Sequence, residues 1–226
     1  MRTMLAESDV VVIAHDVNLS IFRPAWFTKY EVFTEAELEG ELVISPVVVQ
    51  VPTAGFKLTV LPNRLQMAFQ GPSPGSSDDV DRILGRIVRI LPHTPYSACG
   101  LNFTYVATCD DDGFRNWDER LFSSEAARRA GAIGLTDARF GTYFSFDALG
   151  GRLKLDIKPT KTPEQASALA AGWPEGADVV RANFNYHFEL EGAEDPDKAV
   201  LESLAAWQVA AAQSRDLLDA ILGEAK

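Results

Sequence analysis

The stretch GFKLTVLPNRLQMAFQ, residues 55–70, decides the fold class of this chain. Apolar and polar residues alternate on both sides of Pro62-Asn63, which predicts two antiparallel strands joined by a tight turn. One face of this hairpin is apolar and the other is polar, so only one face is expected to be buried. The side chains expected in the core are Phe56, Leu58, Val60, Leu65, Met67 and Phe69.

The residues after this hairpin predict an amphipathic helix that covers its apolar face. A linker rich in Gly, Pro and Ser, residues 71–77, leads to Ser77 or Asp78, either of which can cap the helix. Pro92 and Pro95 end it. Between these limits the apolar residues recur at helical spacing, at Val80, Ile83, Leu84, Ile87, Val88 and Leu91.

The C-terminal part of the chain, residues 139–222, repeats this order of elements. It reads strand, glycine turn, strand, a long insertion over residues 159–178, strand, and a helix that opens at Asp195-Pro196. The repeat indicates an α+β fold with internal duplication of a strand-strand-helix unit. We expect a largely antiparallel sheet of about eight strands, with helices packed on one face.

The domain organisation follows from this repeat. We expect a single α+β domain over residues 1–226, with two pseudo-repeated halves, 1–112 and 113–226, that share one sheet. A hydrophobic fraction of 46% and thirteen Phe residues are enough to form a core. The longest alternating strand is expected over residues 98–109.

The N-terminal half contains two less regular candidate strands. The apolar run over residues 10–14 predicts a central strand that is buried on both faces. Residues 42–51 are strand-like, but Pro46 favours an edge position or a bulge. Between them, Pro24 suits the first turn of a short helix.

The formal net charge of −11 argues against a nucleic-acid footprint, because phosphate binding requires clustered Lys and Arg. The same charge favours a basic partner. No apolar run reaches the ~18 residues that a membrane helix needs, and the N-terminus lacks the apolar core of a signal peptide. We therefore expect no direct nucleic-acid binding, no membrane association and a cytoplasmic location.

The two cysteines, Cys99 and Cys109, are expected on one strand. Ten residues of extended chain separate them by ~33 Å, which is far beyond the reach of a disulfide. Unbridged, buried thiols are therefore expected, as is usual in a reducing compartment.

The chain contains three histidines, at His15, His93 and His187. None of them lies at a spacing typical of metal ligands. His15-Asp16 ends a predicted strand, where active sites often occur. Adjacent strand residues point to opposite faces, so a polar turn explains this pair better than catalysis does.

The remaining motifs also fail to match known chemistry. The three Asp of residues 110–112 suggest a calcium loop, but the twelfth position of that loop is Leu121 instead of Glu. The sequence has no glycine-lysine phosphate loop and no nucleophile elbow. It therefore predicts no catalytic, cofactor-binding or metal-binding residues.

The polar face of the predicted sheet is the strongest candidate for recognition. Its members are Gln66, Asn102, Thr104, Lys154, Asp156, Asn183, Asn185 and His187. Asn is depleted in strands, so Asn183 and Asn185, two residues apart, need a reason. Cross-strand pairing is one reason, and a groove or docking face is another. Trp173, in the insertion, is a further interface candidate, because Trp is enriched at interaction hot spots.

These patterns lead to one principal hypothesis and two alternatives. The principal one is a non-enzymatic, cytoplasmic protein-binding component, such as an adaptor, immunity or assembly factor of a larger bacterial-type complex. Its partner-binding residues would be Trp173, Asn183, Asn185, His187 and Asn102. The first alternative is a small-molecule-binding protein with a pocket between the C-terminal helix and the sheet. The second is an enzyme of unfamiliar type that uses His15, Asp16 or His187.

Overall fold

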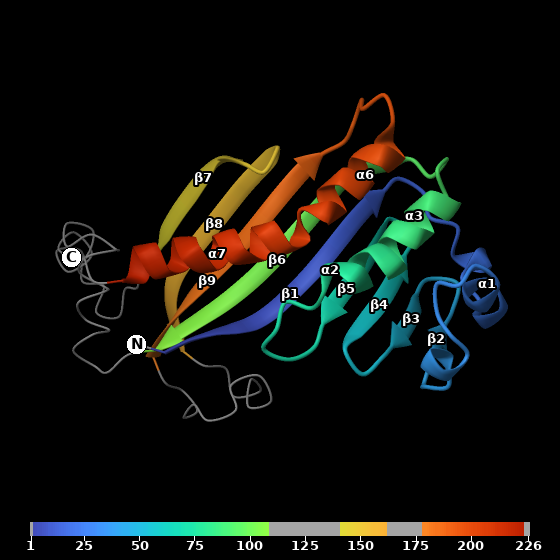
Figure 1. The fold of residues 1–226 in the computed structure, drawn as a ribbon, viewed down its shortest axis with the longest axis horizontal. Coiled ribbons are helices and arrows are strands. Elements are labelled where there is room, and N and C mark those ends of the chain that lie inside the picture. Colours follow the sequence, from blue (N-terminus) through green and yellow to red (C-terminus); the bar gives the residue numbers. More distant parts are fainter. Residues whose placement is uncertain (1, 109–140, 162–177, 224–226) are drawn as a thin grey trace, which may run out of the picture.

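The computed structural model describes residues 2–108, 141–161 and 178–223, and these form one nine-stranded antiparallel sheet with helices (Figure 1). The α+β class expected from the sequence is confirmed. The strands are β1 (Arg2–Ala14), β2 (Val43–Ile44), β3 (Val49–Pro52), β4 (Phe56–Leu61), β5 (Arg64–Phe69), β6 (Tyr96–Thr108), β7 (Thr142–Ala148), β8 (Gly151–Lys161) and β9 (Asp178–Glu189).

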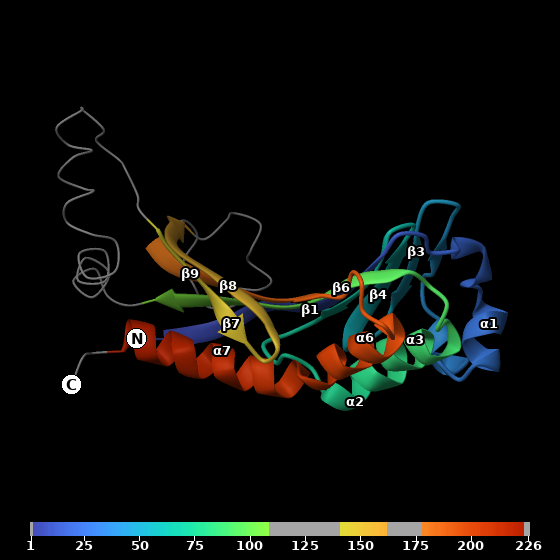
Figure 2. The ribbon, with the colours of Figure 1, turned by 90° about the horizontal axis from the view of Figure 1, so that it is seen from above.

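The described helical segments fall into three groups, which lie between β1 and β2, between β5 and β6, and after β9. The bounds are η1 (Leu19–Ile21), α1 (Pro24–Lys29), η2 (Ala36–Leu38), α2 (Ser77–Val80), the π-helical turn η3 (Asp81–Gly85), α3 (Arg86–Ile90), α6 (Pro196–Ala205) and α7 (Trp207–Leu222). Figure 2 shows α2, α3, α6 and α7 on one side of the sheet. We call this the covered face and the opposite side the open face. Helix packing on one face is thereby confirmed.

The strand order is β2-β3-β4-β5-β1-β6-β9-β8-β7, with β1 and β6 at the centre. Each half has one plan: β1 pairs with β5, which continues to β4 and β3, and β6 pairs with β9, which continues to β8 and β7. A helical segment then follows in each half. This repeat of strand order divides the chain between α3 and β6. The boundary expected between residues 112 and 113 lies outside the described residues.

The hairpin that decided the fold class forms as expected. Strands β4 and β5 pair from Phe56↔Phe69 to Leu61↔Arg64 across the two-residue turn at Pro62-Asn63. The helical stripe is also confirmed, because Val80, Ile83, Leu84, Ile87 and Val88 are buried. The cap is one residue earlier than expected: the Oγ atom of Ser76 accepts a hydrogen bond from the backbone N–H of Asp79 at 3.0 Å.

Two strand predictions in the N-terminal half need correction. The central position of β1 is confirmed, but burial on both faces is wrong: Val10 and Val12 are fully buried, whereas Ile13 is 39% exposed on the open face. Residues 42–51 form two short paired strands, β2 and β3. The turn between them contains Pro46, and it is held by a backbone hydrogen bond from Ser45 to Val48 at 2.9 Å. Pro46 thus separates two strands at the sheet edge.

The sheet also extends further into the predicted insertion than expected. Strand β8 continues to Lys161, and Pro159 pairs with Val180 of β9. The described pairing of β8 with β7 ends before this position, at Thr142↔Ile157.

The two halves of the covered face meet at Trp207. The long helix expected at the C-terminus is divided at Ala206 into α6 and α7, and Trp207 opens α7. Its ring is fully buried, with centroid distances of 4.5 Å to Phe103 and 5.3 Å to Phe69. Large aromatic side chains therefore fill the space between this helix and the sheet.

Replacement of Trp207 by Ala is expected to lower the free energy of unfolding by ~3–5 kcal/mol, because it opens a cavity at this aromatic contact. The matched control is Val209→Ala on the same helix, since Val209 is 56% exposed and should change stability by less than ~0.5 kcal/mol. Urea unfolding followed by circular dichroism measures both. A loss under ~1 kcal/mol for Trp207→Ala would show that α7 does not pack on the sheet as described.

Cys99 is a free, fully buried thiol on the covered side of β6. Burial raises the pKa of its thiol to about 12, so the reactive thiolate is scarce at neutral pH. Cys109 lies outside the described residues.

The Cys109→Ala protein should therefore not react with a thiol reagent in its native state at neutral pH. After unfolding in denaturant without reductant, one thiol per chain should titrate. Rapid labelling of the native variant would contradict the burial of Cys99.

Candidate functional site

The open face carries a continuous band of polar side chains across the middle of the sheet. In the described residues no helix lies over this face at β1, β6 and β9 (Figure 2). The register places Asp9, Asn102, Asn185 and Lys154 side by side on four adjacent strands. Because residues that are paired across strands share a face, the predicted polar face is built as one surface.

The central part of this band is a chain of hydrogen bonds that we call the polar ladder: Gln66, Asp9, Asn102 and Asn185. The side-chain amide of Asn185 donates to Asn102 Oδ1 at 2.7 Å, and the amide of Asn102 donates to Asp9 Oδ1 at 2.6 Å. From the other side, Gln66 Nε2 donates to Asp9 Oδ2 at 3.2 Å. The ladder thus links four strands, β5, β1, β6 and β9.

A second network lies beside the ladder, one step along the strands. The Thr104 hydroxyl donates to Asn183 Oδ1 at 3.1 Å, and Arg181 Nε donates to the same oxygen at 3.1 Å. Arg181 also forms an ion pair with Glu7 at 3.2 Å. Asn183 is therefore held by hydrogen bonds that are separate from those of Asn185.

His187 lies on the opposite side of the ladder. Its neighbours across the strands are Gly100 of β6 and Arg152 of β8, and its Nε2 atom is 3.3 Å from the Glu189 carboxylate. Gly100 has no side chain, and a Cβ atom placed there would meet nothing closer than 3.8 Å. Strand β6 therefore presents no side chain at the position beside His187.

The structure thus brings together four of the five residues predicted for partner binding. Asn102, Asn183, Asn185 and His187 lie half-buried on the open face of the adjacent strands β6 and β9. Trp173 lies outside the described residues.

Sequence reasoning missed Asp9, Glu7 and Arg181. The first two were missed because the strand was predicted only over residues 10–14, whereas β1 begins at Arg2. The pairing shifts between Leu5↔Tyr105 and Glu7↔Thr104, which leaves Ala6 without a partner. This β-bulge places Glu7 and Asp9 on the open face. The alternation of Arg181 with Asn183 and Asn185 was a usable signal for the third.

Asp9 is the half-buried acid at the centre of the ladder. Desolvation by burial raises the pKa of its carboxyl above 3.8, and the hydrogen bonds from Asn102 and Gln66 partly oppose this effect. Glu7 raises the pKa further, whereas Arg64 lowers it. Both carboxylate oxygens accept a hydrogen bond, which is the arrangement of the deprotonated form.

This shift predicts how Asp9→Asn changes the pH dependence of stability. A carboxyl with a raised folded-state pKa stabilises the fold at low pH, and this contribution is lost as the pH rises through that pKa. Between about pH 3.5 and about pH 7 the wild type should therefore lose stability relative to Asp9→Asn. Urea unfolding across this pH range measures the difference. A gain by the wild type with rising pH would contradict the direction of the shift.

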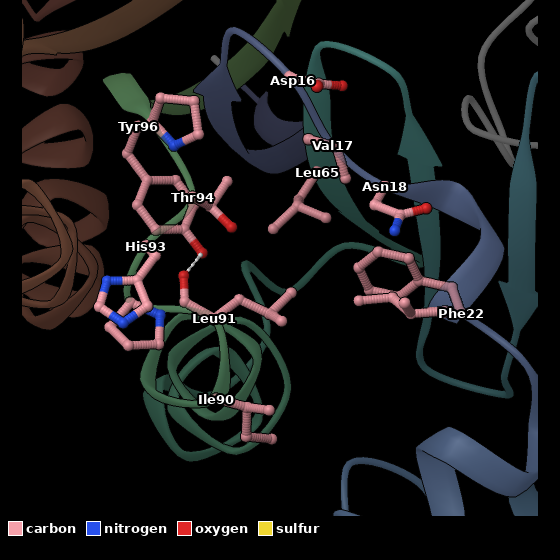
Figure 3. A pocket seen from close by; sticks show the side chains of 13 residues that line it. Asp16, Val17, Asn18, Phe22, Leu65, Ile90, Leu91, His93, Thr94 and Tyr96 are labelled. Atoms are coloured by element: carbon pink, nitrogen blue, oxygen red, sulfur yellow. Dashed lines mark hydrogen bonds between the residues drawn. The ribbon is translucent and has the colours of Figure 1, made fainter.

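A pocket of about 520 Å³ lies at one end of the sheet, between the end of α3 and the segment after β1 (Figure 3). Its apolar lining includes Val17, Phe22 and Leu65. Asp16 also lines this pocket, and it lines a second pocket of about 600 Å³ on the other side of the same segment. The Tyr96 hydroxyl donates a hydrogen bond to the Leu91 carbonyl at 3.2 Å, so its proton is already engaged within the protein.

The histidines do not form a common site. His93 lines the first pocket, and His15 Nε2 lies 3.9 Å from Glu191 with both side chains exposed. His187 lies on the open face of β9. Within residues 2–108, 141–161 and 178–223, no three His, Cys, Asp or Glu side chains are placed to hold a metal ion.

The small-molecule alternative expects a pocket between the C-terminal helix and the sheet. Both pockets described above lie away from it. Between α7 and the sheet, Tyr186, Phe103 and Trp207 are buried, and Ser214 donates a hydrogen bond to the Tyr186 hydroxyl at 3.1 Å. This packing gives the alternative no support from the described residues.

No protein-family model matches the chain, and no curated protein matches it. Among the helices that the structure describes, none combines the length and the apolar character needed to cross a membrane.

Proposed function

We propose that the protein is a non-enzymatic, cytoplasmic binding component that holds a partner protein on its open face. The observation that carries the proposal is the polar band itself: Asn102, Asn183 and Asn185 lie half-buried on the open face of β6 and β9 and are preorganised by hydrogen bonds. Preorganised groups lose little conformational freedom on binding, which favours recognition.

The chemistry of the band supports binding over catalysis. Its central groups are side-chain amides and a hydroxyl, which form hydrogen bonds but do not exchange protons readily at neutral pH. A catalytic site needs a nucleophile or a base aimed at a substrate position. Asp9, the acid of the ladder, instead has both oxygens engaged by neighbouring amides.

The charge of the chain supports a basic partner. The formal net charge of −11 attracts basic proteins over a distance of about a Debye length, and it slows the approach of acidic ones. Buried Cys99, a free thiol, is compatible with the reducing environment of the cytoplasm.

The test is affinity capture of partners by the intact protein, with identification by mass spectrometry. The double variant Asn183→Ala/Asn185→Ala should reduce capture of the partner about tenfold or more, because it removes two hydrogen-bonding groups from the face. The matched control is Gln50→Ala, a polar residue on the distant strand β3, which should leave capture unchanged. Circular dichroism confirms that each variant is folded.

Two outcomes would contradict the proposal. One is full capture by the folded double variant. The other is loss of a biological activity on a single change, His15→Ala or His187→Ala, while the fold and partner capture are retained, which would favour an enzyme. Capture that weakens at high salt would support steering by the acidic charge.

A further inference from the structure

The polar ladder has a direction. Asn185 donates its side-chain N–H to Asn102, and Asn102 donates its own to Asp9, so both amides donate toward Asp9. Asn102 also accepts the hydrogen bond from Asn185 through its carbonyl oxygen. A carboxylate has only acceptor atoms, so any amide that faces it must present its NH₂ group. The orientation of Asn102 then dictates that of Asn185.

This direction determines what the far end of the ladder offers. The NH₂ group of Asn185 is used by Asn102, so its Oδ1 atom is left as the acceptor. Lys154 of β8 is the cross-strand neighbour of Asn185 on the same face. Among the hydrogen bonds and ion pairs of the described residues, none involves Asn185 Oδ1 or the ammonium group of Lys154. An acceptor and a donor thus lie side by side.

We infer that Asp9 is the positioning residue of the open face: its carboxylate orients Asn102 and Asn185, so that Asn185 Oδ1 and the Lys154 ammonium group together recognise an amide of the partner. An amide fits because its N–H matches Asn185 and its carbonyl oxygen matches Lys154. This assignment of the partner group rests on the proposed function.

The same geometry makes the ladder sensitive to the charge of Asp9. Protonation converts one acceptor oxygen into a donor, so one of the two amides that face Asp9 must rotate or lose its hydrogen bond. The groups around Asp9 are Glu7 on its own strand, Arg64 and Gln66 on β5, and Asn102 on β6. Arg181 of β9 reaches this group through its ion pair with Glu7.

The first test uses the isolated, ¹⁵N-labelled protein and needs no partner. The side-chain NH₂ signals of Asn102 and Asn185 should shift together as the pH is lowered, with a common midpoint above 3.8. Asp9→Asn should abolish this shared titration, whereas Glu7→Gln, the matched control on the same strand, should retain it. If the Asn185 signals do not titrate, or titrate unchanged in Asp9→Asn, Asp9 does not position Asn185.

The second test compares capture of the partner by Asn185→Ala, Lys154→Met and the double variant. Each single change should weaken binding about tenfold, and the double variant should lose little more if both groups hold one amide. Independent, additive losses would overturn the shared amide. Full binding by all three variants, with the shared titration present, would show instead that the open face is not the binding surface, so the proposed function would fail.

Discussion

The antiparallel pairing of β1 with β6 is the constraint on which the rest of the structure depends. Both strands are 13 residues long, and they pair from Arg2↔Thr108 to Ala14↔Tyr96. Each then receives the last strand of its own half, β5 and β9, on its other side. The sheet is therefore continuous, and the helical segments that follow β5 and β9 reach the same face, where Trp207 joins them.

This central pair also creates the open face. The bulge at Ala6 allows Leu5 and Val10 to be buried on the covered face, while Glu7 and Asp9 lie on the open one. A shift of one residue would reverse this arrangement and place two carboxylates under the helices, where desolvation is costly. The bulge and the polar band are consequently two results of one register.

The polar ladder links strands through side chains that are only half-buried. Its hydrogen bonds connect four strands, and burial of Asp9 has an energetic cost that the amides of Asn102 and Gln66 partly offset. Stability alone does not need such a network, since apolar or β-branched residues pair well on a sheet surface. This is the physical reason behind the proposal that the band is a recognition surface.

The sequence by itself determined the α+β class, the hairpin around Pro62-Asn63, the helical stripe from Val80 to Val88 and the common face of Asn183 and Asn185. Each of these depends on local periodicity, which follows from the geometry of a single strand or helix. Only the tertiary structure decided the strand order, the bulge at Ala6, the split of residues 42–51 into β2 and β3, and the role of Asp9. Those features depend on pairing between residues far apart in the chain, as with Asp9 and Asn102, and no local pattern specifies which strands become neighbours.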